Sequence, residues 1–413
     1  MQEVIKQIAA VIEGTEFAGN TYIAGGYVRD LVLGNEKSDL DIAVALPEGG
    51  IKLAEFLHEK GLASKPVVFQ QFGTALVEIN EQKIEFVMTR NESYRRGNRK
   101  PLTSPGTLLE DIIRRDFTIN SLVMNIITGE ILDLTGKGLT DIKEGVIRAT
   151  SDPDFIFHDD PLRILRAVRF ANRLQFQIEE VTSAAMKKDS YELNCISWER
   201  RRDEFEKILL SETPELGTKL LYEYNLMQYL IPELQNSVKE LPYQEITALP
   251  AEIILRIAAV LQVLADQPES EEIISLIIDR LRFSSNIKKR VQFLVINNYQ
   301  LSLLIEAKGK NLQIRKLVYY HPRWISEFVL YYSEFAKSRN WQYQPEKLVA
   351  EINNFKSEIV HRKFPLDGNL IKQEFEIPEG EEIGRIKKKG LERWLLNPDL
   401  TAEDLLLLLN QQD

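Results

Sequence analysis

The pattern of hydrophobic and polar positions changes near residue 145. Before it, short apolar runs show the two-residue period of strands and are bounded by Gly, Pro and Asn. These runs are 21–26, 40–46, 65–79, 82–90 and 128–136. Residues 1–14 and 51–61 have helical periods, and Gly61 closes the second of these helices. The first 145 residues therefore predict a mixed α/β domain.

After residue 145 the strand signals nearly vanish, and the apolar residues follow the 3.6-residue period of helices. The clearest helical stretches are 163–174, 199–210, 252–265 and 271–283. Polar breaks at 236–250 and 364–384 predict domain boundaries. At 413 residues the chain exceeds one ordinary core, so we expect several domains.

Composition narrows the class of protein. With 44% hydrophobic and 28% charged residues and no long apolar run, the chain resembles a folded, soluble protein without a membrane span or signal peptide. Its single cysteine, Cys195, excludes an internal disulfide and favours the cytoplasm. A net charge of −10 argues against a uniformly basic surface for nucleic acid, although a local basic groove is compatible with it.

Two carboxylates end the strand candidate near residue 40. Asp39 and Asp41 point to the same face of a strand because side chains repeat every two residues. Their repulsion is relieved if a divalent cation lies between them, and open oxygen sites suit Mg²⁺. Glu85, on a neighbouring strand candidate, can supply a third carboxylate. The alternative is an exposed edge strand with solvated acids.

A glycine pair precedes these acids. Gly25 and Gly26 follow the strand at 21–24 and open a helix, which leaves backbone N–H groups free to bind phosphate. Arg29 lies one turn into that helix, within reach of a triphosphate. A strand, a Gly-Gly turn, a helix and a second strand with two acids together predict a nucleotide–metal site.

The motifs GGYVRDLVLG, SDLD, GTLLEDIIRRDFTINSLVMN, DDPLRILRAVRF and ISWERRRDEFEKILL resemble those of the class II tRNA nucleotidyltransferases. That family comprises CCA-adding, CC-adding and A-adding enzymes and bacterial poly(A) polymerases. The resemblance implies a seahorse-shaped molecule with an α/β, polymerase-β-like nucleotidyltransferase head at 1–145. All-helical parts are expected to follow: a neck at 146–212, a body at 213–300 and a tail at 301–413.

The resemblance also implies roles for single residues of the head. Asp39 and Asp41 would bind the catalytic Mg²⁺ ions, with Glu85 as a further catalytic carboxylate. Gly26, Arg29 and one or both of the pair Arg114 and Arg115 would contact the triphosphate. The metals would activate the 3′-hydroxyl of the RNA and neutralise the leaving pyrophosphate. The alternative for RRDFTIN is a structural arginine–aspartate pair.

Base selection is expected from the start of the DDPLRILRAVRF motif. On one helix, Asp160, Arg163 and Arg166 would share a face, since they are three residues apart. In the family, the corresponding acid and arginine read the incoming base, which here implies Asp160 and Arg163. The arginine donates to the ring of C or A, and the carboxylate accepts from the exocyclic amine, whereas U and G fail at both positions. Arg166 and Arg169 complete the expected nucleotide-binding set. An ordinary amphipathic helix is the alternative.

Two further segments bear on the activity. The family usually has Glu-Asp where this chain has Asp159-Asp160, which puts the supporting contact of the first acid in question. Residues 89–107 are rich in Arg, Gly, Pro and Ser and predict a loop, at the place of the family's flexible loop for the switch from C to A addition. Its presence favours complete CCA addition or A addition, and the alternative is a solvated basic loop.

The sequence thus predicts a Mg²⁺-dependent enzyme that adds CCA to the 3′ end of tRNA from CTP and ATP. Basic clusters at 287–293 and 385–394 are candidates for tRNA contact, or are solvated faces. The nearest alternatives are an A-adding enzyme or a poly(A) polymerase of the same family. A catalytically silent RNA-binding protein is the alternative from another class. An antibiotic nucleotidyltransferase would share the head but would not explain the neck motif.

Overall fold

A computed structural model describes residues 1–35, 40–93, 102–236, 241–303, 307–339, 341, 344–359 and 362–411. The chain forms two compact units, Met1–Gln235 and Asn236–Asp413. The second unit begins where the polar break at 236–250 begins. The proposed limits of head, neck, body and tail at 145, 212 and 300 stay predictions.

The first unit contains a seven-stranded mixed sheet of order β3-β4-β5-β2-β1-β8-β9. Its strands are β1 (Thr21–Ala24), β2 (Asp41–Val44), β3 (Val67–Phe69), β4 (Thr74–Ile79), β5 (Gln82–Met88), β8 (Val123–Asn125) and β9 (Ile131–Leu132). β2 and β5 run parallel, and the other neighbours are antiparallel. The predicted strands of the first 145 residues are thereby confirmed.

The two faces of the sheet have different partners because side chains alternate along each strand. Ile42 and Phe86 are fully buried on one face, across which helix α3 (Gly49–Glu59) packs. The approach is close: a Cβ on Gly50 would lie 2.6 Å from the carbonyl oxygens of Gly73 and Phe86. Asp41 and Glu85 belong to the other face, part of which is covered by an apolar cluster of Ala24, Ala43, Ile112 and Val123.

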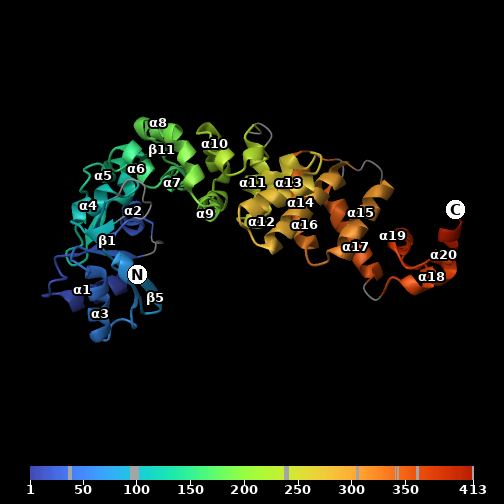
Figure 1. Cartoon of the computed structure of the whole chain (residues 1–413), viewed down its shortest axis with the longest axis horizontal. Coiled ribbons are helices and arrows are strands. Elements are labelled where there is room, and N and C mark those ends of the chain that lie inside the picture. The colour runs from blue at the N-terminus through green and yellow to red at the C-terminus, as the bar shows by residue number, and fades with distance from the viewer. Residues whose placement is uncertain are drawn as a thin grey trace. The chain divides into compact units, whose positions relative to one another are not determined.

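Helices lie beside the sheet of the first unit, and further helices follow it in the chain (Figure 1). They are α1 (Gln2–Ile12), α2 (Gly26–Val32), α4 (Leu108–Ile113), η2 (Thr118–Asn120), α5 (Gly138–Glu144), α6 (Pro153–Asp159), α7 (Leu162–Leu174), α8 (Glu180–Asp189), α9 (Trp198–Leu209) and α10 (Pro214–Glu223). A short parallel pair, β10 (Val146–Ile147) and β11 (Gln177–Ile178), lies among these helices. Ser197 caps α9, and Thr107 forms a capping box with Glu110 at α4.

Residues 89–107 are only partly the loop that the sequence predicts. β6 (Arg90–Ser93) and β7 (Leu102–Pro105) pair as an antiparallel ribbon, and 94–101 lie outside the described residues. The base of the ribbon is closed by hydrogen bonds between Thr89 and Gly106. Backbone pairing forms strands here without a hydrophobic period, which is why the pattern did not reveal them.

The described residues of the second unit form helices joined by turns, without strands. Its helices are α11 (Tyr243–Ala248), α12 (Ile253–Leu261), α13 (Ser270–Arg280), α14 (Ser285–Leu303), α15 (Ala307–Tyr320), α16 (Ile325–Ser338), α17 (Pro345–Ile359), α18 (Gly368–Phe375), α19 (Glu381–Leu396) and α20 (Ala402–Asn410). α12 is buried almost entirely, and the polar Gln262 beside it accepts hydrogen bonds from Asn298 and Tyr331. Within the described residues, no helix is long and apolar enough to cross a membrane.

Candidate active site

A cavity of about 920 Å³ lies over the open face of the sheet in the first unit. Its lining comes from β1, β2 and β5, from α2, α4 and the turn after α4, and from α7 and α9. Each expected site residue within the described part of the chain lines this cavity. Segments nearly 180 positions apart thus contribute to one site.

Two of the predicted carboxylates are direct neighbours in the sheet. Asp41 of β2 and Glu85 of β5 are register partners in the parallel pair, which confirms the predicted adjacency of their strands. Both side chains are exposed on the cavity side. Asp39 lies outside the described residues. Within the described part of the chain, no three carboxylate, histidine or cysteine side chains form a metal-binding cluster.

The glycine turn brings backbone close to these acids. Ala24, the last residue of β1, pairs with Asp41, and Gly25 follows with φ of 70° and ψ of −132°. Side chains strongly disfavour this conformation. A Cβ on Gly25 would lie 3.6 Å from Arg115 Nη1 and 4.0 Å from Asp41 Oδ2. The turn therefore lies between a cation and a carboxylate, where a side chain would come into contact with both.

Arg29 is more deeply placed than the sequence suggests. Its side chain is 3% exposed, donates to Asp30 Oδ1 at 2.7 Å through Nε, and donates to Asn120 Oδ1 at 2.6 Å through Nη1. Burial lowers the pKa of the Arg29 guanidinium, and the charge of Asp30 opposes this effect. Arg29 therefore lines the cavity with a guanidinium that already has partners.

The pair Arg114 and Arg115 shares one carboxylate. Arg115 donates to Asp111 Oδ2 at 2.9 Å, and Arg114 donates to Asp111 Oδ1 at 3.3 Å. Burial alone would raise the pKa of Asp111, but Arg115 and Arg114 hold it below its ordinary value. The Arg115 side chain, 22% exposed and next to Gly25, is the one of the pair that lies beside the glycine turn.

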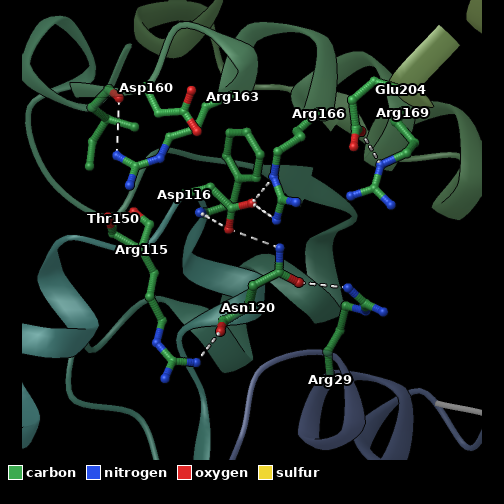
Figure 2. A network of polar contacts seen from close by, with 12 residues as sticks. Arg29, Arg115, Asp116, Asn120, Thr150, Asp160, Arg163, Arg166, Arg169 and Glu204 are labelled. Atoms are coloured by element: carbon green, nitrogen blue, oxygen red, sulfur yellow. Dashed lines mark hydrogen bonds and ion pairs between the residues drawn. The ribbon is translucent and has the colours of Figure 1, made fainter. Parts of the chain in front are cut away.

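A buried polar network joins the sheet side of the cavity to α7 (Figure 2). Asp116 accepts from Arg166 through Oδ2 and from Asn120 through Oδ1, and Asn120 in turn accepts from Arg29. Burial would raise the pKa of Asp116, but Arg166, Asn120 and the Phe117 N–H together lower it. The sequence analysis missed Asp116 and Asn120 as site residues, although both lie within the RRDFTIN motif.

The expectation that Asp160 and Arg163 share one helix face is wrong. α6 ends at Asp159 and α7 begins at Leu162, so Asp160 lies between two helices in extended conformation. Pro161 explains the break, because the residue before a proline disfavours helical angles. Arg163 and Arg166 do share α7, and both Asp160 and Arg163 still line the cavity.

Asp160 and Arg163 have separate partners. Arg163 pairs with Asp159 at 3.0 Å and donates to the carbonyl oxygens of Ile156 and Arg114. The aspartate at 159 therefore makes a supporting contact to this arginine, although the family usually has the longer glutamate there. Asp160 instead accepts from Arg200 of α9 at 2.9 Å.

Arg169 completes the row of arginines on α7. Its Nε lies 2.7 Å from Glu204 Oε2, and its guanidinium lies 4.3 Å from the centre of the Phe170 ring (Figure 2 shows the ion pair). Arg29 and Arg166 also lie over Phe170, at 5.3 and 5.4 Å. Burial lowers the pKa of Arg169 despite Glu204. Contacts with Phe170 and with carboxylates thus hold Arg166 and Arg169 in place at the cavity.

Comparison with known proteins agrees with this architecture. Residues 21–148 match the poly A polymerase head domain, and residues 175–237 match a probable RNA and SrmB-binding site of polymerase A. The CCA-adding enzyme of Lactiplantibacillus plantarum is 36% identical over 245 residues, 58% of this chain and 57% of that enzyme. The A-adding tRNA nucleotidyltransferase of Aquifex aeolicus is 43% identical over 172 residues, 40% of this chain and 20% of that protein.

One solved structure is similar in fold over the whole length of this chain. The crystal structure of the Bacillus stearothermophilus CCA-adding enzyme in complex with CTP has a TM-score of 0.70 at 21% identity, covering 100% of this chain and 97% of that one. This comparison confirms the predicted α/β head followed by helical parts. The alignments with the first curated relatives cover 57–58% of those proteins' length.

The mixed sheet has acids on β2 and β5, with a glycine turn beside them and a helical continuation. These features resemble a nucleotidyltransferase head of the poly(A) polymerase type. More particularly, residues 21–148 and 175–237 resemble domains of poly(A) polymerases, and CCA-adding enzymes are among the relatives at 36–38% identity. Similarity to nucleotidyltransferases implies dependence on a divalent metal. The carboxylate oxygens of Asp41 and Glu85, adjacent and exposed in the cavity, are suitable ligands for such an ion.

Proposed function

We propose that this protein adds CCA to the 3′ end of tRNA, using CTP and ATP and releasing pyrophosphate. The observation that carries the proposal is that one cavity holds both the acids of the sheet, Asp41 and Glu85, and the pair Asp160 and Arg163. The first pair suits nucleotidyl transfer, and the second suits selection of C and A without a template. The CCA-adding relatives support the choice of product.

The metal is proposed to be Mg²⁺, held by Asp41 together with Asp39, with Glu85 as the neighbouring carboxylate. When bound, such ions activate the 3′-hydroxyl and neutralise charge on the α-phosphate and on the leaving pyrophosphate. The chain's own contribution is to fix carboxylate oxygens on two adjacent strands. Hard oxygen ligands and an open site favour Mg²⁺ over softer metals.

The triphosphate is proposed to lie against the glycine turn and Arg115. Gly25 and Gly26 carry no side chain there, and Arg115 Nη1 is close to the turn. A planar guanidinium that donates to phosphate oxygens is a strong and orienting ligand. Arg114 stabilises this region because it pairs with Asp111, which also binds Arg115. Arg29 contributes by donating a hydrogen bond to Asn120.

The base is proposed to meet Arg163 as donor and Asp160 as acceptor. Both C and A offer an exocyclic amine to a carboxylate and a ring acceptor to an arginine, whereas U and G offer a carbonyl and an N–H. A mismatch leaves polar groups unpaired in the site, and this makes rejection strong. Arg166 and Arg169 are engaged by Asp116 and Glu204, so we assign them to shaping the pocket.

The helical parts are proposed to bind the tRNA, with the neck at 146–212, the body at 213–300 and the tail at 301–413. Lys387, Lys388 and Lys389 of α19 are exposed and suited to phosphate contacts, whereas Lys288 and Arg290 of the other basic cluster pair with Asp279 and Glu327. The single cysteine suits a reducing compartment, so the proposed location is the cytoplasm.

A second candidate is addition of the terminal A alone. The similarity to the A-adding tRNA nucleotidyltransferase of Aquifex aeolicus favours it specifically. The poly A polymerase head domain is compatible with a third product, a poly(A) tail. The carboxylate pair in the cavity argues against a catalytically silent RNA-binding protein.

The deciding experiment offers the protein tRNAs that lack the whole CCA end, its last two nucleotides or only the final A. CTP and ATP are supplied separately and together, and the products are resolved at single-nucleotide length. A CCA-adding enzyme completes each tRNA and stops. Addition of A only to the last substrate would identify an A-adding enzyme, and unlimited A addition a poly(A) polymerase. No extension of any tRNA would overturn the proposal.

Base selection has its own test with Asp160→Ala and Arg163→Ala. A charge-assisted hydrogen bond contributes about 1.5–3 kcal/mol, which corresponds to roughly one to two decades in selectivity. Both variants should therefore discriminate less against UTP and GTP and should react more slowly with CTP and ATP. Single-turnover incorporation of each nucleotide measures both effects. Variants that lost speed but kept wild-type selectivity would show that the pair is structural.

A further inference from the structure

The Asp160 carboxylate is held on both of its oxygens. Oδ1 accepts from the Leu162 N–H at 3.2 Å, at the start of α7, and Oδ2 accepts from Arg200 Nη2 at 2.9 Å. Arg200 belongs to α9, forty positions further along the chain, and lines the same cavity. The orientation of the proposed base acceptor therefore depends on a residue outside the motif that contains it.

Three consecutive arginines on α9 have three different environments. Arg201 is buried, lies 3.5 Å above the Trp198 ring and donates to the Tyr229 carbonyl oxygen. Arg202 pairs with Asp203 at 2.6 Å within the helix. Of these three residues, Arg200 is the one that lines the cavity. The helix thus directs one specific guanidinium toward Asp160.

The contact between Arg200 and Asp160 contributes little to folding. The side chains are 51% and 30% exposed, and exposed ion pairs contribute little to stability. The contact instead fixes the orientation of the Asp160 carboxylate. An ionised carboxylate has about four acceptor positions, so two remain for a base after Leu162 and Arg200 have bound. Without Arg200 the carboxylate can rotate, and its free acceptors no longer have one direction.

We propose that Arg200 is a positioning residue for base selection, which aims the free acceptor of Asp160 at the exocyclic amine of C or A. This inference rests on the proposed function. Arg163 is oriented independently, by Asp159 and by the Ile156 carbonyl oxygen. The donor and the acceptor that face the base are therefore fixed by separate supports, and α9 provides the support for the acceptor.

The test is Arg200→Ala, assayed by single-turnover addition of C and A to tRNA lacking its CCA end or its final A. KM for CTP and ATP should rise about three- to tenfold, because the acceptor must be ordered during binding. The rate at saturation should change less, and preference for CTP over UTP should fall by a similar factor. Arg200→Lys should restore part of the selectivity, and Arg202→Ala is the matched control that should behave as wild type. Thermal midpoints are compared to show that all variants fold.

A double-mutant cycle separates this inference from its basis. In an Asp160→Ala background, Arg200→Ala should have no further effect on selectivity. A persistent effect there, or unchanged selectivity in Arg200→Ala alone, would overturn the inference while leaving the function intact. Wild-type selectivity in Asp160→Ala itself would overturn the proposed base reading and the inference with it.

Discussion

Asp116 and Arg166, fifty positions apart, form an ion pair between the turn that follows α4 and helix α7, in which the aspartate is buried. Asn120 donates to the second carboxylate oxygen, and the pair borders the cavity that holds the candidate active site. Asp116 is 6% exposed, so its charge is stabilised almost entirely by these contacts. The pair joins the part of the site that faces the sheet to the part proposed to read the base.

Replacing Asp116 with Asn should destabilise the first unit by about 1–3 kcal/mol, since Arg166 loses its charged partner. Because the folded pKa of Asp116 lies below its ordinary value of 3.8, its contribution is present above that pH and is lost as the pH falls through the folded pKa. The difference between wild type and variant should therefore be constant near neutral pH and shrink below about pH 4. Urea unfolding at several pH values measures it.

Asp154→Asn provides the matched control for this prediction. Asp154 pairs with Lys188, and both side chains are more than half exposed. The loss should stay below about 1 kcal/mol. If Asp116→Asn cost no more than this surface variant, the buried pair would not contribute to the stability of the first unit.

Asp41→Asn should reduce transfer of every nucleotide by about two decades or more, because a metal ligand that stabilises transition-state charge by several kcal/mol is lost. Glu85→Gln should have a smaller effect in the same direction. Both variants should still fold without metal, which thermal unfolding shows. Single-turnover rates over a range of Mg²⁺ concentrations, with thermal unfolding in its absence, measure both effects.

Glu78→Gln is the control for these acids, because Glu78 lies exposed on β4 of the same sheet and does not line the cavity. It should transfer nucleotides at the wild-type rate. Near wild-type activity in Asp41→Asn would show that the metal site has been assigned to the wrong residues.

Gly25→Ala should cost both stability and activity. At φ of 70° and ψ of −132° an alanine is strained by about 1–3 kcal/mol, and its methyl group would lie beside Arg115 and Asp41. Gly34→Ala is the matched variant: its φ is 76°, and no heavy atom lies within 4 Å of the added carbon. It should lose stability alone. Thermal unfolding and CTP incorporation distinguish the two, and equal loss of activity in both would contradict a phosphate role for the turn.

Shortening the ribbon formed by β6 and β7 should separate the two kinds of addition. Removing residues 92–103 retains the hydrogen bonds between Thr89 and Gly106 that close its base. If this segment supports the switch from C to A, the variant adds both C residues and fails to add the final A. Product lengths with CTP alone and with both nucleotides measure this. A parallel loss of C and A addition would point instead to folding or to general tRNA binding.

The sequence by itself determined the succession of elements and the type of chemistry. A two-residue period marks β2 and β5 whatever their neighbours are. A glycine pair between a strand and a helix permits close backbone approach, and the acids that follow indicate what it approaches. The adjacency of Asp41 and Glu85 was only inferred from the sequence, and the pairing of β2 with β5 confirms it. Conformational preferences and motif spacing are properties of short segments, so they can be predicted from the sequence without the tertiary structure.

Only the tertiary structure decided which charges meet. Arg163 pairs with Asp159, which is near in sequence. Asp160 pairs with Arg200, and Arg166 pairs with Asp116. The partners in these two pairs are 40 and 50 positions apart. A single helix through the DDPLR motif would have paired Asp160 with Arg163, but Pro161 separates two helices there. An arginine pairs with any carboxylate whose oxygens packing brings within about 4 Å of its nitrogens. This packing depends on the whole first unit. For that reason the sequence identified the charged residues of the site, and the fold determined their partners.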